Sequence, residues 1–518
     1  MILEALNFVL YFLISIIYFY STLGFGKFLS NQNSNFFDYQ FEGTIFLLVI
    51  GYFLYLSIGI NVILNLAIIV TGIVLFILNK QKKTTVELKY IFLLFFLIFS
   101  VLIISKTHED FNTYHYFSIF EVFNNNLRIG VSLLNERFFH SSNLIFNQAL
   151  IILPYFEFQI VHLPVFIIYL STIGYFVFVI FSKTSKSHEL FFSLLCVLIL
   201  LVKFNRLSEY GYDYIAQFIL LIVFHKIYFL SLNKSEIIKS ITYFIFSILI
   251  KPISLLFLPI FFFILYKKDV TFIKKLPHTK YFIIVLLFSI LLSSSFFRTG
   301  CIFYPLNSTC FSKDKIFWSE KERIKQYSQE VSLWAKGYYV QNESKYKKID
   351  DKKLFNKNLN WIKFWVEKHF FYKIYEFILL LIASIFLIYI YCNKKNYNYK
   401  IHKKEKIIVL GLSLISIIFW INTVPQFRFG FSAIIIFLFF FLSLFLNLNI
   451  KFNKKKFTHI LIFGLLILNF KNLNRIDDEF KRNDFYKFIN FPYFNEITIK
   501  NDYSKLKKEN FFHIELLK

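Results

Sequence analysis

The sequence predicts an all-α protein, a polytopic transmembrane helical bundle of about 13–14 spans with amphipathic surface helices in its outer loops. Three observations predict this class. Hydrophobic residues make up 57% of the 518 residues, and the mean hydropathy is +0.56. Apolar runs recur along the chain and reach the roughly 20 residues that cross a bilayer as a helix. These runs are continuous, whereas the strands of an outer-membrane barrel alternate between apolar and polar residues.

The formal net charge is +26, and the positions of the Lys and Arg residues along the chain are more informative than this total. Basic membrane proteins use Lys and Arg to set their topology, so we expect a lipid bilayer and no nucleic acid as partner. The 74 Phe residues, with Ile, Lys, Asn and Tyr also in excess, are typical of AT-rich codon usage. Single aromatic residues therefore weigh little as functional signals.

Residues 1–89 are expected to form the N-terminal transmembrane helices. The first apolar run carries Glu4 and has no Lys or Arg before it, which indicates a retained helix rather than a cleaved signal peptide. The apolar run at 44–78 is too long for one span. Gly59 and Asn61 lie near its middle, so we expect two helices there.

Residues 90–296 are expected to form a transmembrane core with an acidic outer loop at 106–158. The first helix of this core covers 90–105. Charged and apolar residues mix over 117–158, as they do in helices that lie along a membrane surface. Further spans are expected at 159–181, 190–202, 214–230, 237–250, 253–266 and 281–295.

The rest of the chain divides into a long extracytoplasmic loop at 297–370, the C-terminal transmembrane helices at 371–470 and an extracytoplasmic tail at 471–518. Every second connection between spans is short and rich in lysine. These connections are 80–89, 183–186, 234–239, 267–280, 394–406 and 451–456. The positive-inside rule assigns them to the cytoplasm. Most of the unusual polar residues then face the outside of a bacterial inner membrane.

An acidic pair, Glu109 and Asp110, stands with His115 where the helix at 90–105 leaves the membrane. Carboxylates at a bilayer interface are poorly tolerated unless they have a partner or a task, so this pair is either a solvated helix end or a catalytic centre. A carboxylate can take a proton from an attacking hydroxyl or ligate a divalent cation. Mg²⁺ or Mn²⁺ suits Asp110 and Glu109, but no ligand spacing requires a metal, and no other cofactor is expected.

Further polar residues are predicted on the same outer face. Glu209 and Asp213 add carboxylates at the mouth of a span, and Lys251 lies between two apolar runs. Snorkelling to the interface is the alternative explanation for Lys251. Arg298 starts the long loop, and Arg428 lies in a short turn bounded by proline and glycine. Arg and Lys can neutralise a phosphate leaving group without reacting themselves, which suits transfer of a group from a lipid-linked phosphate.

Cys301 and Cys310 share the long outer loop, where oxidation is favoured in a cell-envelope protein. Pro305 and Asn307 lie between them and suit a turn that brings the two cysteines together. We therefore predict a disulfide. Two free thiols are the alternative, because sequence alone does not fix the distance between the two Cα atoms.

With many spans, an acidic pair just outside an early helix and a later long outer loop, the chain resembles the GT-C superfamily of polyprenyl-phosphate-sugar-dependent glycosyltransferases. The protein mannosyltransferases and the aminoarabinose transferases belong to it. There an acidic motif in the first large outer loop acts as catalytic base or metal ligand, and the resemblance places this role on Glu109 and Asp110. Here the acidic loop follows the fourth span rather than the first, so an extra helical hairpin precedes the shared core.

The middle of the chain is also similar to bacterial membrane proteins found with surface-polysaccharide genes. The similar segments are 209–213, 300–305, 309–310, 334–337 and 428–430. This second resemblance implies a role in the assembly of a surface glycan.

These features predict an inverting membrane glycosyltransferase of bacterial cell-surface glycan assembly, for O-antigen, capsule or lipopolysaccharide. Its donor is a polyprenyl-phosphate-linked sugar and its acceptor a glycan or a lipid. Asp110 is the expected base, with Glu109 as the alternative. The other outer-face residues are expected to bind the substrates, namely His115, Glu209, Asp213, Lys251, Arg298 and Arg428.

Two other classes of protein compete with this prediction. An O-antigen or capsular polysaccharide polymerase or ligase uses a polyprenyl-diphosphate-linked glycan and would depend on Arg298, Arg323 and Arg428 more than on the acids. A lipid-linked glycan flippase or transporter would carry its charges near the middle of the membrane, in broken helices of repeated halves. The acids here lie at the outer rim, which ranks the transporter third.

The lysine pattern makes a testable prediction of topology. Reporter fusions at Lys83 and at Ser328 should give opposite signals, because the first position lies in a lysine-rich connection and the second in the long outer loop. The measurement pairs a reporter that is active only in the cytoplasm with one that is active only outside. The same signal at both positions would overturn the topology.

Overall fold

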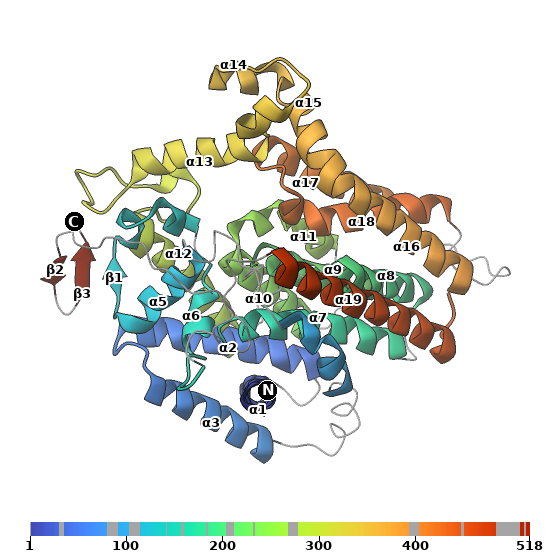
Figure 1. Cartoon of the computed structure of the whole chain (residues 1–518), viewed down its shortest axis with the longest axis horizontal. Helices are drawn as coiled ribbons and strands as arrows, with labels where there is room; N and C mark the ends of the chain where they lie inside the picture. Colours follow the sequence, from blue (N-terminus) through green and yellow to red (C-terminus); the bar gives the residue numbers. More distant parts are fainter. Residues whose placement is uncertain are drawn as a thin grey trace.

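The structure is a computed structural model that describes residues 2–30, 36–79, 92–102, 114–140, 142–156, 160–182, 185–203, 212–230, 234–267, 278–392, 403–446, 450–482, 508–511 and 514–517. It is an all-α helical bundle with very little strand, which confirms the predicted fold class (Figure 1). Within these ranges nine helices are long and apolar enough to cross a membrane. Three shorter apolar helices cover Val62–Leu78, Phe92–Leu102 and Pro252–Tyr266. The chain is a multi-pass membrane protein.

Three helices begin the bundle: α1 (Ile2–Leu29), α2 (Phe36–Leu56) and α3 (Val62–Leu78). The predicted division of the second apolar run is confirmed. Gly59 has a φ of +80°, and the side chain of Asn61 caps α3 by accepting a hydrogen bond from the N–H of Leu64 at 3.0 Å. α1 and α3 approach closely. A Cβ atom on Gly24 would lie only 1.8 Å from the carbonyl oxygen of Gly72, so this contact requires a glycine.

The segment that was expected to hold amphipathic helices consists of short elements. They are α5 (Tyr116–Asn124), β1 (Arg128–Ile129), η3 (Val131–Leu133), η4 (Glu136–His140) and α6 (Ile145–Ala149). The side chain of Asn147 donates a hydrogen bond to the carbonyl of Thr44 in α2, at 2.9 Å. The hydroxyl of Ser132 donates to the carbonyl of Arg298, at 2.6 Å. These bonds tie the segment to the transmembrane helices.

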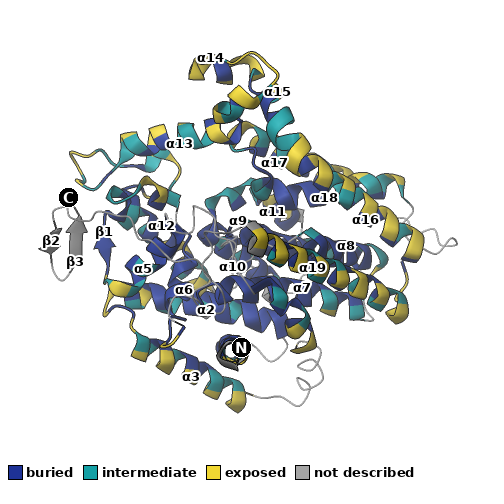
Figure 2. Cartoon of the chain, viewed as in Figure 1, coloured by how far each residue is buried: buried dark blue, intermediate teal, exposed yellow. Residues whose placement is uncertain are grey.

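The most deeply buried helices lie in the middle of the chain. They are α7 (Leu163–Phe181), α8 (Ser187–Lys203), α9 (Tyr212–Phe229) and α10 (Lys234–Ile250). The 3₁₀ helix η7 (Pro252–Phe257), α11 (Leu258–Lys267) and α12 (His278–Thr299) follow. Figure 2 shows α7, α8 and α9 almost entirely in the colour of buried residues. They form the core of the bundle.

The C-terminal helices cover this core from one side (Figure 1). They are α15 (Ile362–Trp365), the π-helix η12 (Val366–Tyr375), α16 (Glu376–Cys392), α17 (Lys403–Thr423), α18 (Phe427–Phe445) and α19 (Lys454–Arg482). α16, α17 and α19 expose large apolar side chains along their outer sides (Figure 2). Lipid tails are as apolar as leucine, so such faces suit contact with a bilayer.

The long loop between α12 and α15 projects from one end of the bundle, which we call the loop end (Figure 1). Its elements are η9 (Asn307–Thr309), α13 (Lys321–Ala335), η10 (Tyr338–Glu343), α14 (Lys352–Asn356) and η11 (Lys357–Leu359). The opposite end of the bundle, where α9 finishes near Lys226, is called the lysine end.

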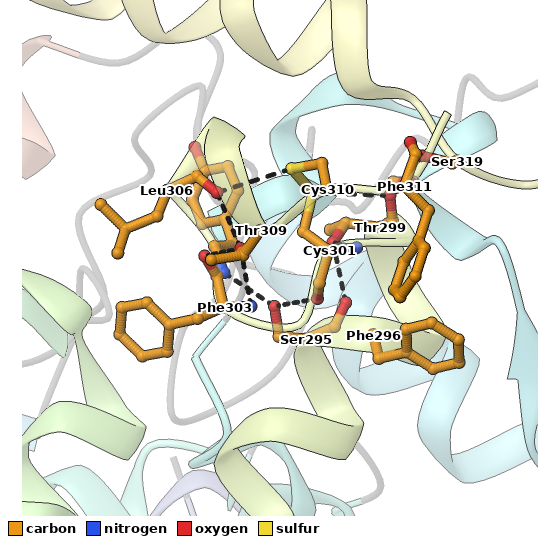
Figure 3. Close-up of a disulfide and its surroundings, with 12 residues drawn as sticks. Ser295, Phe296, Thr299, Cys301, Phe303, Leu306, Thr309, Cys310, Phe311 and Ser319 are labelled. Atoms are coloured by element: carbon orange, nitrogen blue, oxygen red, sulfur yellow. Dashed lines mark hydrogen bonds between the residues drawn. A yellow bond between two sulfur atoms is a disulfide. The ribbon is translucent and has the colours of Figure 1, made fainter. Parts of the chain in front are cut away.

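A disulfide joins Cys301 to Cys310 at the start of this loop, as the sequence predicts (Figure 3). The turn that it closes is tied to the last turns of α12 through Ser295. The Ser295 hydroxyl donates to the carbonyl of Cys301 at 3.0 Å and accepts from the N–H of Tyr304 at 2.9 Å. The two sulfur-bearing residues also pack in a small apolar cluster with Phe139, Ile324 and Tyr327. The disulfide therefore braces the loop against η4.

Two strands near the C-terminus complete a small sheet at the loop end. β2 (Lys508–Phe511) and β3 (Ile514–Leu517) form an antiparallel hairpin, and β3 pairs in parallel with β1, giving the order β1-β3-β2 (Figure 1). The sequence predicts that the C-terminal tail lies on the same side of the membrane as the acidic outer loop. The pairing with β1 joins these two parts of the chain.

A buried ion cluster lies at the lysine end and consists of Asp38, Glu42, Lys226, Glu236 and Lys239. The ammonium of Lys226 contacts the Asp38 carboxylate at 2.9 Å and that of Glu236 at 2.7 Å. Lys239 lies 3.3 Å from Asp38, and the Tyr243 hydroxyl donates to the same carboxylate at 3.1 Å. The ends of α2, α9 and α10 therefore meet, and the lysine pattern assigns all three ends to one face.

Replacing Lys226 by methionine should destabilise the protein by about 3–5 kcal/mol, because it removes the more buried of the two cations that Asp38 and Glu236 share and leaves Lys239 alone to compensate them. The measurement is thermal unfolding of the purified protein in detergent. Lys481→Met is the control, since Lys481 pairs with Asp477 at an exposed position. Equal unfolding temperatures for the two variants would show that the buried cluster contributes no stability.

Candidate functional site

Three charged residues meet at the loop end, and we call them the Asp213 cluster. The Lys251 ammonium lies 3.1 Å from one carboxylate oxygen of Asp213, and the Nε atom of Arg428 lies 3.0 Å from the other. The side chains of Asp213 and Lys251 are 15% and 11% exposed, whereas that of Arg428 is 39% exposed. Two cations therefore share the carboxylate of Asp213. The structure thus brings together three residues that the sequence selected separately.

Lys251 is placed by the proline that follows it. Pro252 cannot continue α10, and a residue before proline is restricted to an extended conformation. Lys251 has φ −150° and ψ 119°, so the helix ends at Ile250 and the chain turns into η7. Asp213 lies in the first turn of α9, where the helix dipole favours a negative charge. The C-terminal end of α10 and the first turn of α9 therefore meet through this ion pair.

Arg428 is placed by a turn whose carbonyl groups are bound by side chains. The Trp365 indole donates to the carbonyl of Pro425 at 2.7 Å, and the Trp420 indole donates to that of Gln426 at 2.8 Å. The Gln426 amide in turn donates to the carbonyl of Ala335, at the end of α13, at 3.3 Å. The bonds of Trp365 and Ala335 dock the long loop and α15 on the turn between α17 and α18, and the bond of Trp420 ties the turn to α17.

The exposed part of Arg428 is bordered by the long loop. Its guanidinium lies over the ring of Trp334, with the carbon 5.8 Å from the ring centroid. Arg428 also stands in the first turn of α18. A guanidinium at a helix N-terminus is well suited to bind an anion, because both carry positive charge and N–H donors.

Two histidines extend the site toward the acidic loop. The ring of His115 lies 4.0 Å from that of Tyr114 and 5.0 Å from that of Tyr212, measured between centroids. His140 lies 5.5 Å from the Tyr114 ring and is stacked at 5.7 Å on Tyr327 of α13. Rings from the start of α5, from η4, from α9 and from α13 thus form a wall that reaches Tyr212, the neighbour of Asp213 in the sequence.

The charged residues of this site shift the pKa of His140. Burial and then the positive charge of Lys251 hold the pKa of His140 well below its usual range, and His115 and Arg137 lower the pKa further. Asp213 acts in the opposite sense. The imidazole of His140 is therefore neutral near pH 7.

Arg298 and Arg323 lie apart from the Asp213 cluster, each with partners of its own. Arg298 donates to Asn143 at 2.9 Å and lines a small cavity of about 30 Å³, together with the buried ion pair of Arg128 and Glu121. Arg323 pairs with Glu320 at 2.8 Å on the long loop. The three arginines that a polymerase would use thus stand in three different surroundings.

The sequence-predicted residues Glu109, Asp110 and Glu209 lie outside the described residues. The apolar helix that precedes the acidic pair is fixed by α19, because the Ser100 hydroxyl donates to the side chain of Asn469 at 2.8 Å. Among the residues that the structure describes, no three His, Cys, Asp or Glu side chains gather as a metal site. The candidate metal ligands Asp110 and Glu109 are not among those residues.

His140 and Tyr327 could not be predicted from the sequence, because their neighbours come from distant parts of the chain. Tyr212 lies in segment 209–213, one of those similar to the surface-polysaccharide proteins. Trp334 lies in one of the segments shared with surface-polysaccharide proteins, and that resemblance was the available signal.

Comparison with known proteins gives a family but no activity. Residues 1–435 match the profile of a family described as "Domain of unknown function (DUF8201)". No curated protein and no solved structure matches the chain. The matched region includes the whole Asp213 cluster, both histidines of the ring wall and the turn that holds Arg428.

Replacing Gly430 by alanine should disturb the turn that places Arg428. The added Cβ would lie 2.7 Å from the ring of Trp420, whose indole binds the carbonyl of Gln426, and such overpacking typically costs about 1–3 kcal/mol. Gly411→Ala is the matched control on α17, since its Cβ meets no atom within 4 Å and alanine favours a helix. Thermal unfolding should show a loss for Gly430→Ala only; similar values would contradict the proposed role of Trp420.

Proposed function

This chain belongs to the DUF8201 family, and we propose that it is a membrane glycosyltransferase of bacterial cell-surface glycan assembly. In this proposal it transfers a sugar from a polyprenyl-phosphate donor to a glycan or lipid acceptor on the outer face of the inner membrane. The single observation that carries the proposal is the Asp213 cluster, which brings two cations together on one carboxylate at the loop end of a transmembrane bundle.

The composition of this cluster supports binding of a lipid-linked phosphate. Lys251 and Arg428 bring two cations to one point at the ends of membrane helices, where a charged group is tolerated best beside an anion. Arg428 offers a partly exposed guanidinium, and guanidinium groups bind phosphate through two parallel hydrogen bonds. A donor whose polyprenyl chain lies in the bilayer would present its phosphate at this level.

Each residue then has a distinct task in the proposed reaction. Lys251 and Arg428 hold the donor phosphate and stabilise the charge that develops on it as the sugar leaves. Asp213 positions both cations. Asp110, with Glu109 as the alternative, takes the proton of the acceptor hydroxyl or holds a divalent cation.

Two competing functions fit these contacts less well. A polymerase or ligase acting through Arg298, Arg323 and Arg428 jointly is not favoured, since the first is enclosed with Asn143 and the second pairs with Glu320. A flippase or transporter suits charges near the middle of the membrane. Here the Asp213 cluster stands at the ends of its helices.

Glycan profiling of a deletion strain complemented at matched expression separates the enzyme classes. Asp110→Asn should lower glycan transfer by about a hundred- to ten-thousand-fold, the usual worth of general-base catalysis. Arg428→Lys should weaken donor binding, because lysine keeps the positive charge but lacks the planar pair of N–H donors of a guanidinium. Arg323→Lys should leave the glycan unchanged.

A polymerase predicts the reverse order of effects. Changes of Arg323 and Arg428 would then shorten or abolish the glycan, and Asp110→Asn would be mild. A wild-type glycan in the Asp110→Asn strain would defeat the transferase proposal.

A further inference from the structure

The small cavity beside Arg298 is a feature of the loop end to which the proposed function gives no task. Tyr52 and Tyr55 line it from α2, Glu121 from α5, Arg128 from β1 and Arg298 from α12. Both tyrosines are buried, with 3% and 7% of their surface exposed. The cavity therefore lies where elements from distant parts of the chain meet, and its polar groups are shielded from bulk water.

The two tyrosines of this cavity differ in their hydrogen bonds. The Ser293 hydroxyl donates to the carbonyl of Ser289 at 2.6 Å, so the hydroxyl of Tyr52, 2.6 Å from Ser293, is the donor to it. The hydroxyl oxygen of Tyr55 accepts the N–H of Arg128 at 3.1 Å. Among the residues that the structure describes, no oxygen accepts the phenolic proton of Tyr55. Buried donors almost always have an acceptor, so we expect one inside the cavity.

The volume of the cavity limits what this acceptor is. It measures about 30 Å³, and a cavity needs about 10–15 Å³ to hold one water molecule. A chloride ion is only slightly larger than a water molecule and fits this space. A sugar or a lipid-linked phosphate is too large for it. The acceptor is therefore either water or an ion of a single atom.

The charges around the cavity favour an ion over water. Two guanidinium groups line it, and a charge acts more strongly on its neighbours in a protein interior than in water. Arg128 is bound to the carboxylate of Glu121 at 2.6 Å, which compensates that carboxylate. The bonds of Arg298 to the carbonyl of Ser294, at 3.0 Å, and to the side chain of Asn143, at 2.9 Å, go to neutral oxygens. A small anion beside Arg298 gains more from this charge than a neutral water does.

The rest of the wall suits a weakly hydrated anion. It includes the aromatic side chains of Phe138, Phe146 and Phe297. The edges of aromatic rings carry partial positive charge, so such rings can border an anion without donating a hydrogen bond. Chloride and bromide give up their water more readily than a carboxylate or a phosphate, and they accept hydrogen bonds from any direction. A cavity with few donors and many rings therefore selects a halide among the anions.

We propose that this cavity is a binding site for a single halide ion, which is chloride in the cell. The ion accepts the phenolic proton of Tyr55 and lies beside the guanidinium of Arg298. It joins α2 to the end of α12, and so connects the transmembrane bundle to the start of the long loop. This site goes beyond the proposed function and does not depend on it.

Thermal unfolding of the purified full-length protein in detergent tests the proposal. The protein should unfold at a temperature about 2–4 °C higher in sodium chloride than in sodium gluconate of equal ionic strength, because a ligand that binds only the folded state stabilises it. Gluconate is the control anion, since it is too large for the cavity, and bromide should act as chloride does. Equal unfolding temperatures in chloride and gluconate would show that the cavity holds water and would overturn the proposal.

Two tyrosine variants on α2 locate the ion. Tyr55→Phe keeps the ring and removes the phenolic proton, so the difference between chloride and gluconate should fall to less than half. Tyr52→Phe makes the same change in the same cavity, but the proton that it removes is already bound by Ser293. Its unfolding temperature falls in both salts and the difference between them stays. A full difference in Tyr55→Phe would place the ion elsewhere and contradict the proposed site.

Bromide in crystals of the wild-type protein gives a test that needs no variant. Anomalous diffraction from crystals grown in sodium bromide should show a peak in the cavity, next to the hydroxyl of Tyr55. Density without an anomalous signal at this position would identify an ordered water and would refute the halide site.

Discussion

The shared carboxylate of Asp213 is the contact on which the loop end depends. Lys251 and Arg428 come from helices that are far apart in the sequence, and at a membrane boundary neither cation is stable without a partner. Asp213 binds both and so joins α9, the break after α10 and the start of α18. Removing that carboxylate would leave two cations facing each other across the site. Breaking such a partly buried arrangement costs more than its formation gains, because the remaining charges lose their compensation.

The same helices are fixed again at their other ends. Asp213 and Lys226 are both on α9, and 13 residues of helix span about 20 Å. Lys239 and Lys251 mark the two ends of α10 in the same way. The pair α9 and α10 is therefore tied by ion pairs at both ends, which fixes the axial position of one helix relative to the other.

Local sequence signals predicted the structure correctly where a residue determines the conformation of the residues next to it in the chain. Gly59 and Asn61 divided an apolar run, Pro252 ended a helix and set the backbone of Lys251, and Cys301 was paired with Cys310. Such local signals could not predict contacts between residues that are far apart in the sequence. Lys239 was counted among the topology lysines, yet its ammonium is buried against Asp38, 201 positions away.

The placement of the arginines shows the same limit. Arg298 looked equivalent to Arg428 as an outer-face cation, but its hydrogen bond to the buried side chain of Asn143 gives it a structural setting that no spacing in the sequence reveals. His140 gains its neighbours from α5, α9, α10 and α13 only when the chain is folded. The acidic pair stays a sequence-based proposal, since Glu109 and Asp110 lie outside the described residues.

The turn before Arg428 has an optical consequence. The chain holds five tryptophans. Trp365 and Trp420 bind this turn directly, Trp334 covers Arg428, and Trp361 lies 6.2 Å from Trp365. Four of the five indoles thus stand at the junction of the long loop with α17 and α18. The intrinsic tryptophan fluorescence of the protein therefore reports mainly on this junction. Binding of an anion at Arg428 should change that fluorescence, so that no added label is needed to detect it.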